Sequence, residues 1–370
     1  LTGFPWNIWA YSFSWATEIL QILNKTGLFT FNLIAITIFM LPAALFLKIN
    51  FVKKSLILIS LLLIVFILYI YGNHSINQNK DYLNSQKEKF YIKIVSPNLK
   101  LKYGLDSNEI FIRLKKLIRF SDPQSKLKTL FVWPEGVFSG YSFSEIENFK
   151  EIFLENFSEN HLILFGVNKL NIKEKKYFNS LVVINNQMEI LGEYNKQKLV
   201  PFGEFLPFEK FLNQFGLKKI TEGHGSFLSG NAQENLLIDK LNILPLICYE
   251  IIFTKFIQQS DKDTNLIVNI SEDGWFGNSI GPEQHFAKAV FRAIEQNSFL
   301  IRSANKGISA IINNKGIIVK KLDFNEAGNI DLQVPLIKSK NRIKNDLIFF
   351  ILLITYIFIF YFYEKNNDTK

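Results

Sequence analysis

The stretch Leu244-Pro245-Leu246-Ile247-Cys248-Tyr249-Glu250 places the only cysteine of the chain at the end of an apolar run. An apolar run that turns polar and acidic at once is typical of a buried parallel strand that presents a side chain at its carboxyl end. A lone cysteine, however, is more often an inert core residue. From this stretch alone, Cys248 is either a nucleophile or a core side chain.

Two polar residues upstream stand in similar settings. Glu135 follows the apolar run of Thr129-Leu130-Phe131-Val132-Trp133-Pro134-Glu135-Gly136, and Lys196 lies in Tyr194-Asn195-Lys196-Gln197-Lys198-Leu199-Val200-Pro201-Phe202-Gly203-Glu204. Taken singly, Glu135 could be a surface carboxylate at a strand end, and Lys196 could be an ordinary exposed lysine. Glu, Lys and Cys at three strand ends favour one catalytic set.

The three side chains have complementary chemistry. A thiol near neutral pH is mostly protonated, so its attack on an ester needs a base or a cationic neighbour. Glu135 can take the proton from Cys248 Sγ, and Lys196 can lower the pKa of the thiol and stabilise the oxyanion of a tetrahedral intermediate. No histidine is required. Lys198 competes with Lys196 for this role because the two are close in the sequence.

These segments resemble the carbon-nitrogen hydrolase (nitrilase) superfamily, whose catalytic set is Glu-Lys-Cys. They resemble its membrane-bound branch, the apolipoprotein N-acyltransferases, more closely still, and the resemblance covers nearly the whole chain. The combination of LVPFGE, CYE and DGWFG is far more specific than one short motif. The stretches that carry the resemblance are Trp133-Pro134-Glu135, Tyr194-Asn195-Lys196, Leu199-Val200-Pro201-Phe202-Gly203-Glu204-Phe205, Ile247-Cys248-Tyr249-Glu250, Asp273-Gly274-Trp275-Phe276-Gly277, Gly281-Pro282, Gln284-His285, Arg292-Ala293-Ile294-Glu295 and the opening Thr2-Gly3-Phe4-Pro5-Trp6.

The resemblance implies roles for further residues. The family spacing Tyr-x-Lys favours Lys196 over Lys198. Glu204, in the PFGE motif, is expected to keep the amine of Lys196 charged and oriented. Glu250 is expected to support the site in the same indirect way, and the backbone N–H of Tyr249 is a candidate oxyanion donor. Trp275 either walls the substrate pocket or is a core aromatic side chain.

Three positions depart from the family pattern. Lys306 stands where a small or uncharged polar residue is usual, and Glu272 stands where an asparagine is typical. A tryptophan typical of the early outer domain is replaced, with Tyr103 as the candidate. These departures concern the acceptor contacts and leave Glu135, Lys196 and Cys248 intact.

The middle of the chain alternates short apolar strands with amphipathic helices. This pattern fits two packed sheets with helices on both outer faces. The resemblance implies the αββα sandwich specifically, which periodicity alone does not distinguish from another layered α/β fold. The expected strands are 90–96, 129–133, 162–167, 181–184, 243–248, 265–270, 299–303, 308–312 and 316–320, and the expected helices are 108–120, 145–157 and 282–296.

A different kind of segment runs from Glu204 to Asn231. Its Phe and Leu residues alternate irregularly with lysines, and a loop this long is normally functional or disordered. It is either a surface helix packed on the sandwich or an apolar arm, centred on 205–217, that dips into a bilayer beside the active site.

Three apolar runs are about as long as a membrane-spanning helix. They lie at about 27–47, 55–72 and 347–363, and they lack any polar face. The resemblance implies that they belong to a larger transmembrane α-helical bundle of about eight helices, so we expect several further helices on the amino-terminal side. The segment 11–23 is either an interfacial helix or an outer loop of this bundle.

Charge and span length predict the domain organisation. Lys48, Lys53 and Lys54 lie in the loop between the first two spans, which the positive-inside rule assigns to the cytoplasm. We therefore expect a transmembrane region at 1–72, an extracytoplasmic catalytic domain at 73–345, and a last span with a short cytoplasmic tail at 346–370. Basic residues on the outer flank of the last span, from Lys338 to Lys344, oppose this orientation, but the rule is weakest beside long translocated domains.

Composition excludes several classes of protein. The net charge is +9, but the lysines are scattered and carry no nucleic-acid motif, so we expect contact with anionic lipids and none with nucleic acid. One cysteine excludes an internal disulfide. The four histidines show no metal-ligand spacing, so neither a metal nor another cofactor is expected. We expect a monomer.

Three functions remain to be distinguished. The first, implied by the resemblance, is an N-acyltransferase of the bacterial inner membrane that moves an acyl chain from a phospholipid, through a Cys248 thioester, to the N-terminal diacylglyceryl-cysteine of an apolipoprotein. The second is a membrane-anchored amidase that hydrolyses small C–N amides, and the third is an inactive binding module. Apolar spans on both sides of the domain favour a lipid substrate, and the intact Glu-Lys-Cys set opposes the inactive module.

Overall fold

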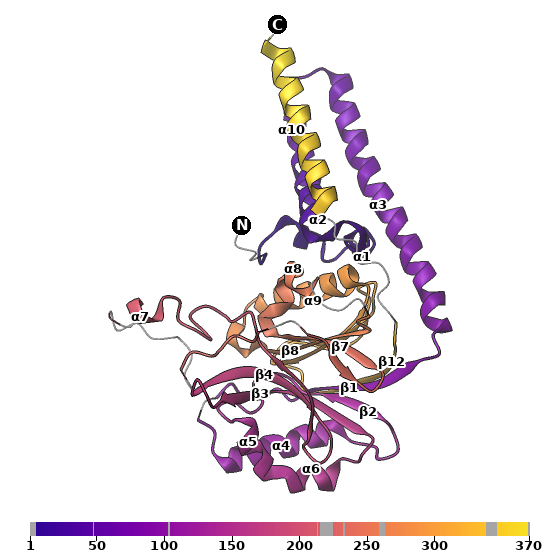
Figure 1. Ribbon diagram of the computed structural model, residues 1–370. Coiled ribbons are helices and arrows are strands. Elements are labelled where there is room, and N and C mark those ends of the chain that lie inside the picture. Colours follow the sequence, from indigo (N-terminus) through magenta and orange to yellow (C-terminus); the bar gives the residue numbers. More distant parts are fainter. Residues whose placement is uncertain are drawn as a thin grey trace.

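Two six-stranded sheets packed face to face form the centre of the molecule, with helices on both outer faces (Figure 1). The computed structural model describes residues 5–46, 48–102, 104–212, 214, 225–231, 234–258, 263–337 and 346–368. This arrangement confirms the predicted αββα sandwich.

The first sheet has the strand order β12-β1-β2-β3-β4-β5. Strands β1, β2 and β3 are parallel, and β4, β5 and β12 pair antiparallel with their neighbours. Because β5 is antiparallel to β4 and β4 is antiparallel to β3, the strands β2, β3 and β5 all run in one direction. The bounds are β1 (Lys89–Ser96), β2 (Thr129–Val132), β3 (His161–Asn171), β4 (Lys176–Ile184), β5 (Ile190–Asn195) and β12 (Gly328–Pro335).

The second sheet has the order β11-β10-β9-β8-β7-β6, with β7, β8 and β9 parallel. Strands β2 and β8 are buried along their whole length because both faces of each sheet are covered. β2 therefore appears in the sequence as a mainly apolar run, whereas β8 begins with Leu266-Ile267-Val268 and also buries the polar Asn269, Ser271 and Glu272. The bounds are β6 (Leu236–Ile238), β7 (Leu241–Ile247), β8 (Leu266–Glu272), β9 (Phe299–Asn305), β10 (Ser309–Ile312) and β11 (Ile318–Leu322).

Helices cover the two outer faces, with α4 to α6 on the first sheet and α8 and α9 on the second (Figure 1). The predicted single helix 145–157 is wrong, because the chain leaves helical geometry at Phe149 (φ −99°, ψ 15°). The helices are α4 (Ser107–Ser121), α5 (Phe143–Ile146), the 3₁₀ turn η3 (Glu147–Phe149), α6 (Lys150–Asn156), α8 (Thr254–Ile257) and α9 (Gly281–Gln296). The expected strands are confirmed within a few residues, but β5, β6 and β12 were not predicted.

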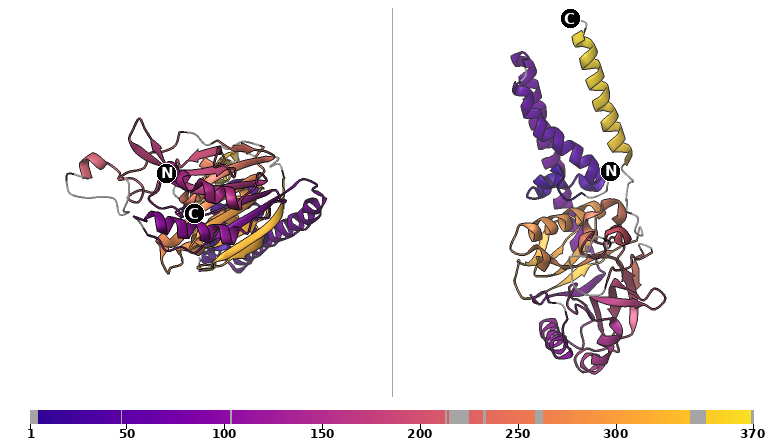
Figure 2. Two further views of the ribbon diagram at one scale, coloured as in Figure 1. Left: turned by 90° about the horizontal axis from the view of Figure 1, so that it is seen from below. Right: turned by 90° about the vertical axis from the view of Figure 1, so that its left-hand side faces the viewer.

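Three apolar helices extend from the α9 side of the sandwich, opposite α4 and α6 (Figures 1 and 2). They are α2 (Leu23–Met40), which is kinked at Gly27 (φ 73°), α3 (Phe51–Ser85) and α10 (Asp346–Asp368). α10 lies beside α2, and Thr37 Oγ1 is 2.6 Å from the Tyr356 hydroxyl. In the described residues, Leu23–Ala43 and Phe51–Ser85 are long and apolar enough to cross a membrane, and the apolar run of α10, Leu347–Phe362, is shorter.

The segment 11–23 forms short helical turns instead of one continuous interfacial helix. η1 (Trp9–Phe13) and α1 (Thr17–Leu20) lie between the sandwich and the apolar helices. The Tyr11 ring packs edge-on against Phe291 of α9, with centroids 4.7 Å apart. This segment is therefore in contact with the sandwich.

In the segment from Glu204 to Asn231, Leu206 is buried and the backbone N–H of Leu228 donates to the carbonyl oxygen of Tyr177 in β4. The described part around residue 209 projects from the sandwich (Figure 1). It includes α7 (Glu209–Leu212), and Phe208 and Phe211 are exposed. This opposes the alternative of a helix packed on the sandwich. The rest of the predicted arm, including Phe215 and Leu217, lies outside the described residues.

Candidate active site

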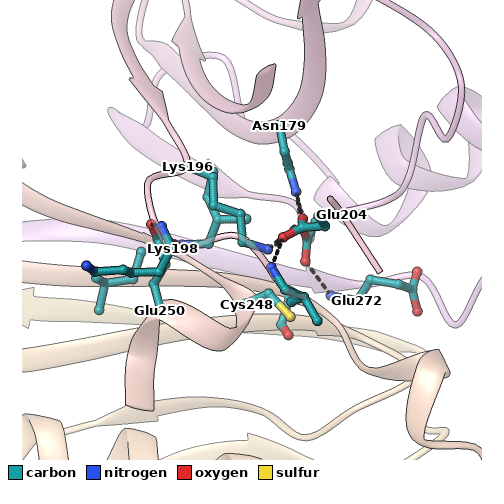
Figure 3. A network of polar contacts seen from close by, with 12 residues as sticks. Asn179, Lys196, Lys198, Glu204, Cys248, Glu250 and Glu272 are labelled. Atoms are coloured by element: carbon teal, nitrogen blue, oxygen red, sulfur yellow. Dashed lines mark hydrogen bonds and ion pairs between the residues drawn. The ribbon is translucent and has the colours of Figure 1, made fainter. Parts of the chain in front are cut away.

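The three predicted catalytic residues come together where the carboxyl ends of strands from both sheets meet. Figure 3 shows Lys196 and Cys248 side by side in this cluster. Glu135 follows β2, Lys196 follows β5 and Cys248 follows β7. Since β2 and β5 run in the same direction, their ends lie at one edge of the first sheet. That edge faces the end of β7 in the second sheet, so residues far apart in the sequence become neighbours.

Lys196 lies between two carboxylates. Its Nζ is 2.8 Å from Glu204 Oε1 and 3.5 Å from Glu135 Oε1, and its side chain is only 1% exposed. Burial alone would lower the pKa of Lys196, but the charges of Glu135 and Glu204 outweigh burial and raise it. The amine therefore carries a positive charge throughout the physiological pH range.

Lys198 points away from this cluster (Figure 3). It is exposed, and its Nζ lies over the rings of Phe253 and Phe256, 6.0 and 5.6 Å from their centroids. Of the two competing lysines, the geometry brings Lys196 to Glu135.

Glu135 accepts two hydrogen bonds that fix its carboxylate. Asn179 Nδ2 donates to its Oε1 at 2.7 Å, and the backbone N–H of Glu272 donates to its Oε2 at 3.0 Å. Asn179 also donates to Glu204 Oε1 at 2.8 Å, so one amide bridges both carboxylates that flank Lys196. Sequence reasoning missed Asn179, because its polar neighbours in β4 give no signal of a functional residue.

The backbone of Cys248 is held in an unusual conformation. Its φ is +53°, in the left-handed region that costs a residue with a Cβ roughly 1–2 kcal/mol. The strand ends there and the 3₁₀ turn η5 (Cys248–Ile252) begins, which presents the side chain at a sharp turn. The carbonyl oxygen lies 3.3 Å from both Asn269 Nδ2 and His285 Nε2.

A buried polar network supports these two contacts. His285 Nδ1 lies 2.9 Å from Asp273 Oδ1, and Arg302 Nη2 donates to Asp273 Oδ2 at 2.7 Å. Arg302 also bonds Asn269. Burial would raise the pKa of Asp273, but the charges of Arg302 and His285 lower it, so Asp273 stays ionised. His285 and Asp273 appeared in the quoted motifs, but their role in holding the Cys248 backbone depends on this packing.

The thiol of Cys248 does not ionise on its own. Burial raises its pKa, the charge of Glu135 raises it further, and the nearby charge of Lys196 opposes both without reversing them. Lys196 lowers the pKa of the thiol, as expected, but burial and the charge of Glu135 together raise it by more. A base must remove the proton as the thiol attacks.

Glu250 organises the two loops that carry Lys196 and Cys248. It is fully buried, and its Oε1 accepts hydrogen bonds from the Tyr194 hydroxyl and from the backbone N–H of Gln197, both at 2.8 Å. Its Oε2 accepts from the backbone N–H of Ile247 at 2.9 Å. Burial raises the pKa of Glu250 to about 7. A carboxyl group bonded to both loops fixes the position of one relative to the other.

Tyr249 and Trp275 lie at the rim of this cluster. Tyr249 is half-buried and packs edge-on against Phe253, with centroids 4.9 Å apart. Trp275 is 49% exposed, which is not the environment of a core aromatic side chain. The oxyanion role of the Tyr249 N–H and the pocket role of Trp275 stay predictions. In the described residues, no group of three or more His, Cys, Asp or Glu side chains could hold a metal ion.

Comparison with known proteins identifies the family. Residues 98–340 match the family model described as carbon-nitrogen hydrolase. The chain belongs to this family. The apolipoprotein N-acyltransferase of Rickettsia typhi is 33% identical over 90% of this chain, and that of Rickettsia prowazekii is 31% identical over 97%. These matches place the chain in the apolipoprotein N-acyltransferase branch.

The chain spans 66% of the R. typhi relative, just under two thirds of its length, and 71% of the R. prowazekii relative. Among solved structures, Saccharomyces cerevisiae Nit3, a member of branch 10 of the nitrilase superfamily, is similar at 14% identity. That match covers 68% of this chain and 91% of the other, with a TM-score of 0.49. As a member of the carbon-nitrogen hydrolase superfamily, this chain is an enzyme.

Two departures from the family pattern now have a structural setting. Glu272 is buried, its Oε2 accepts from Asn305 Nδ2 at 2.7 Å, and its Oε1 accepts from the backbone N–H of Gly274 at 2.8 Å. Lys306 is half-buried, with its aliphatic stem near Gly274. The third departure, Tyr103, lies outside the described residues.

Glu272 should make the enzyme less stable as the pH rises. Burial raises its pKa from 4.5 to about 8, with a smaller contribution from the charge of Glu135. A raised pKa in the folded state means that the folded protein binds more protons than the unfolded chain between these values. The associated stability is complete below pH 4.5 and is lost as the pH rises through 8.

We therefore expect Glu272→Gln to lose less stability than the wild type between pH 5 and pH 9. The difference should approach about 1.4 kcal/mol per pH unit between pH 4.5 and 8, where the folded protein holds the Glu272 proton and the unfolded chain does not. Unfolding midpoints at several pH values test this. The NH₂ group of the glutamine must face one of the two donors, Asn305 Nδ2 or the Gly274 N–H, which changes the stability at every pH. The comparison therefore uses the change of stability with pH and not its absolute value. Parallel curves for the two proteins would contradict the assignment.

Proposed function

We propose that this chain carries the catalytic part of a membrane N-acyltransferase. The enzyme takes an acyl chain from a phospholipid onto Cys248 and passes it to the α-amine of the N-terminal diacylglyceryl-cysteine of an apolipoprotein. The observation that carries the proposal is the cluster itself, a buried and charged Lys196 held between Glu135 and Glu204 beside a thiol that needs a base. Its relatives bear the name of this activity.

In the first half-reaction, Glu135 accepts the proton of Cys248 as Sγ attacks the ester carbonyl carbon of the phospholipid. The carbonyl oxygen becomes an oxyanion, which the charge of Lys196 and the backbone N–H of Tyr249 stabilise. The C–O bond of the ester then breaks, and the leaving alkoxide takes the proton from Glu135. The products are a lysophospholipid and a Cys248 thioester.

In the second half-reaction, the α-amine of the lipoprotein attacks the thioester carbonyl. Glu135 accepts a proton from the amine, the C–S bond breaks, and the departing sulfur takes that proton back. An amide forms and the thiol is restored, so no net proton or electron is consumed. Two half-reactions that share one covalent intermediate require ping-pong kinetics.

The apolar helices support a lipid donor. Side chains along α3, such as Leu56, Ile59 and Leu63, are exposed, and only 6% of its apolar window is buried. A contiguous exposed apolar surface of this kind needs a non-aqueous partner. We propose that α2, α3 and α10 cross the membrane as part of a larger bundle, and that the catalytic domain, about residues 73–345, contacts its surface.

The loop between α2 and α3 sets the proposed orientation. It lies at the ends of these helices that are far from the sandwich, as does the end of α10 (Figure 1). The loop carries Lys48, with Lys53 and Lys54 at the start of α3. Positive charges favour the cytoplasmic side, so the catalytic domain would face the extracytoplasmic side.

Mass spectrometry of the full-length protein tests the function. Incubation with phospholipid and no acceptor should add one acyl mass to the peptide that contains Cys248, and hydroxylamine should remove it. A diacylglyceryl-cysteinyl peptide should then discharge the acyl group to an amide. Cys248→Ala is the control and should acquire no acyl mass.

Two results would contradict the proposal. Rapid release of free fatty acid or small-amide products, with no acyl-enzyme and no transfer, would favour the amidase. Acyl transfer by the Cys248→Ala variant at the wild-type rate would rule out the thioester.

A further inference from the structure

A polar cavity of about 300 Å³ lies where the apolar helices meet the sandwich. Its walls come from four separate parts of the chain: the junction of α1 and α2, the middle of α3, the residue after α9, and the turn between β10 and β11. None of these residues belongs to the cluster around Cys248. The lining residues are Gln21, Asn24, Lys25, Tyr71, His74, Ser75, Gln78, Asn297 and Lys315.

α3 presents one face to this cavity. Tyr71, His74, Ser75 and Gln78 are spaced by three and four residues, which aligns them on one side of a helix. They begin where the apolar part of α3 ends, since the sequence turns polar after Gly72. A Cβ on Gly72 would lie 1.8 Å from the carbonyl oxygen of Glu18, so this glycine allows α3 to pack closely against α1.

The cavity is positively charged. Lys25 and Lys315 both line it, and the nine lining residues, all in the described part of the chain, include no Asp or Glu. Lys315 Nζ is 3.4 Å from the neutral Asn297 Oδ1. Burial lowers the pKa of Lys315, and the nearby charge of Lys25 lowers it further. An anion between the two ammonium groups would offset both effects.

A second feature indicates a ligand that also carries a hydrogen-bond donor. Gln21 is 2% exposed, and its Nε2 donates to the carbonyl oxygens of Thr17 and Lys315, both at 2.9 Å. Its Oε1 is buried and accepts no hydrogen bond from the described residues. A buried amide oxygen without a donor costs about 1–3 kcal/mol. The amine or hydroxyl of a lipid head group would satisfy it.

We propose that this cavity binds a phosphate group, which Lys25 and Lys315 hold between the catalytic domain and α3. The phosphate belongs either to a phospholipid head group or to free inorganic phosphate. The change from apolar to polar residues along α3 favours the head group, because it sets the cavity at the level of the membrane surface. That preference rests on the proposed membrane placement, but the phosphate chemistry does not.

Such a site would anchor the domain to the bilayer at a place other than the catalytic cluster. It would contact four separate segments of the chain, so binding should stabilise the folded protein. A ligand that binds only the folded state raises the unfolding midpoint with its concentration. This makes stability a readout that does not depend on acyl transfer.

The test uses the full-length protein, delipidated in a neutral detergent. Its unfolding midpoint is measured with increasing concentrations of dioleoyl phosphatidylglycerol, of dioleoylglycerol or of inorganic phosphate. Dioleoylglycerol has the same acyl chains but no phosphate. Sodium chloride at matched ionic strength is the salt control. The wild type is compared with Lys25→Gln/Lys315→Gln. The matched control is Lys80→Gln/Lys87→Gln, which removes the same charge at exposed positions outside the cavity.

We expect phosphatidylglycerol to stabilise the wild type and the control, and the cavity variant to bind it at least tenfold more weakly. If inorganic phosphate gives the same lysine-dependent stabilisation, the bound group is free phosphate. If only the phospholipid does so, it is a head group. Equal stabilisation of the cavity variant and the control by every phosphate compound would overturn the proposal.

A second variant covers the case in which the double variant does not fold. Gln78→Glu places a carboxylate in the cavity, so it should stabilise the ligand-free protein and weaken the effect of added phospholipid. An unchanged phospholipid effect in Gln78→Glu would also overturn the proposal. Acyl labelling of Cys248, measured in the same samples, separates failure of this site from failure of the proposed catalytic function.

Discussion

Lys196→Ala should reduce acyl transfer by about 10³-fold or more, because the oxyanion of each tetrahedral intermediate loses its cation. The loss should appear in kcat and in kcat/KM alike, since the interaction forms in the transition state. The assay is transfer of a labelled acyl chain from a phospholipid to a diacylglyceryl-cysteinyl peptide. The buried position of the amine, 2.8 Å from Glu204 and 3.5 Å from Glu135, underlies the size of the expected effect.

Lys198→Ala is the matched control for this substitution. It removes the same kind of side chain two positions away, but from an exposed site over Phe253 and Phe256, so its effect should be mild. The opposite pattern would assign the catalytic role to Lys198. Because Lys196→Ala leaves two buried carboxylates without their cation, its unfolding midpoint must be measured too. Lys196→Arg retains the charge, so it should fold and still transfer slowly, because the planar guanidinium is larger than the amine.

Glu135→Gln should reduce acyl-enzyme formation by roughly 10²–10⁴-fold, which is the usual contribution of a general base. The thiol of Cys248 gives the reason, since burial raises its pKa and Lys196 alone does not ionise it. An amide of the same shape cannot accept the proton. Single-turnover labelling of Cys248 by a phospholipid measures this step directly.

Glu204→Gln separates the loss of a base from the loss of a charge. Glu204 also contacts Lys196 and accepts from Asn179, so the glutamine removes a carboxylate from the same cluster. We expect a smaller effect on acyl-enzyme formation than that of Glu135→Gln. If Glu135→Gln labelled Cys248 at the wild-type rate, Glu135 would not be the base. Equal losses in both variants would indicate that the cluster contributes through its charge alone.

The structure also explains why the site needs an elaborate support. A carboxylate, an amine and a thiol, each largely buried, are costly to hold together unless every charge is paired and hydrogen-bonded. Asn179 donates hydrogen bonds to both carboxylates, Glu135 and Glu204. The backbone of Cys248 is held by His285, which contacts its carbonyl oxygen. Asp273 and Arg302 in turn hold His285 in place.

Local sequence pattern was sufficient for the layered fold and for most of its strands. Strands covered on both faces are rich in apolar residues, so β2 and the first half of β8 were recognisable as apolar runs. β6 was missed because it has only three residues, and β5 and β12 were missed because they are half-exposed and carry polar residues and glycine. The apolar helices were recognisable because length and composition decide whether a helix can span a membrane. The bend of α2 at Gly27 and the continuation of α3 to Ser85 were not predicted.

The sequence by itself determined which residue types stand at the strand ends, and its motifs indicated the family of the enzyme. The family spacing already favoured Lys196 over Lys198, but only the tertiary structure placed the amine of Lys196 3.5 Å from Glu135, because that distance depends on how two strands pack. It also revealed the contacts of Asn179, the burial that raises the pKa of Glu272 and the cavity lined by Lys25 and Lys315. Each of these features depends on burial and on contacts between segments far apart in the chain. No local run of residues encodes such burial or such contacts.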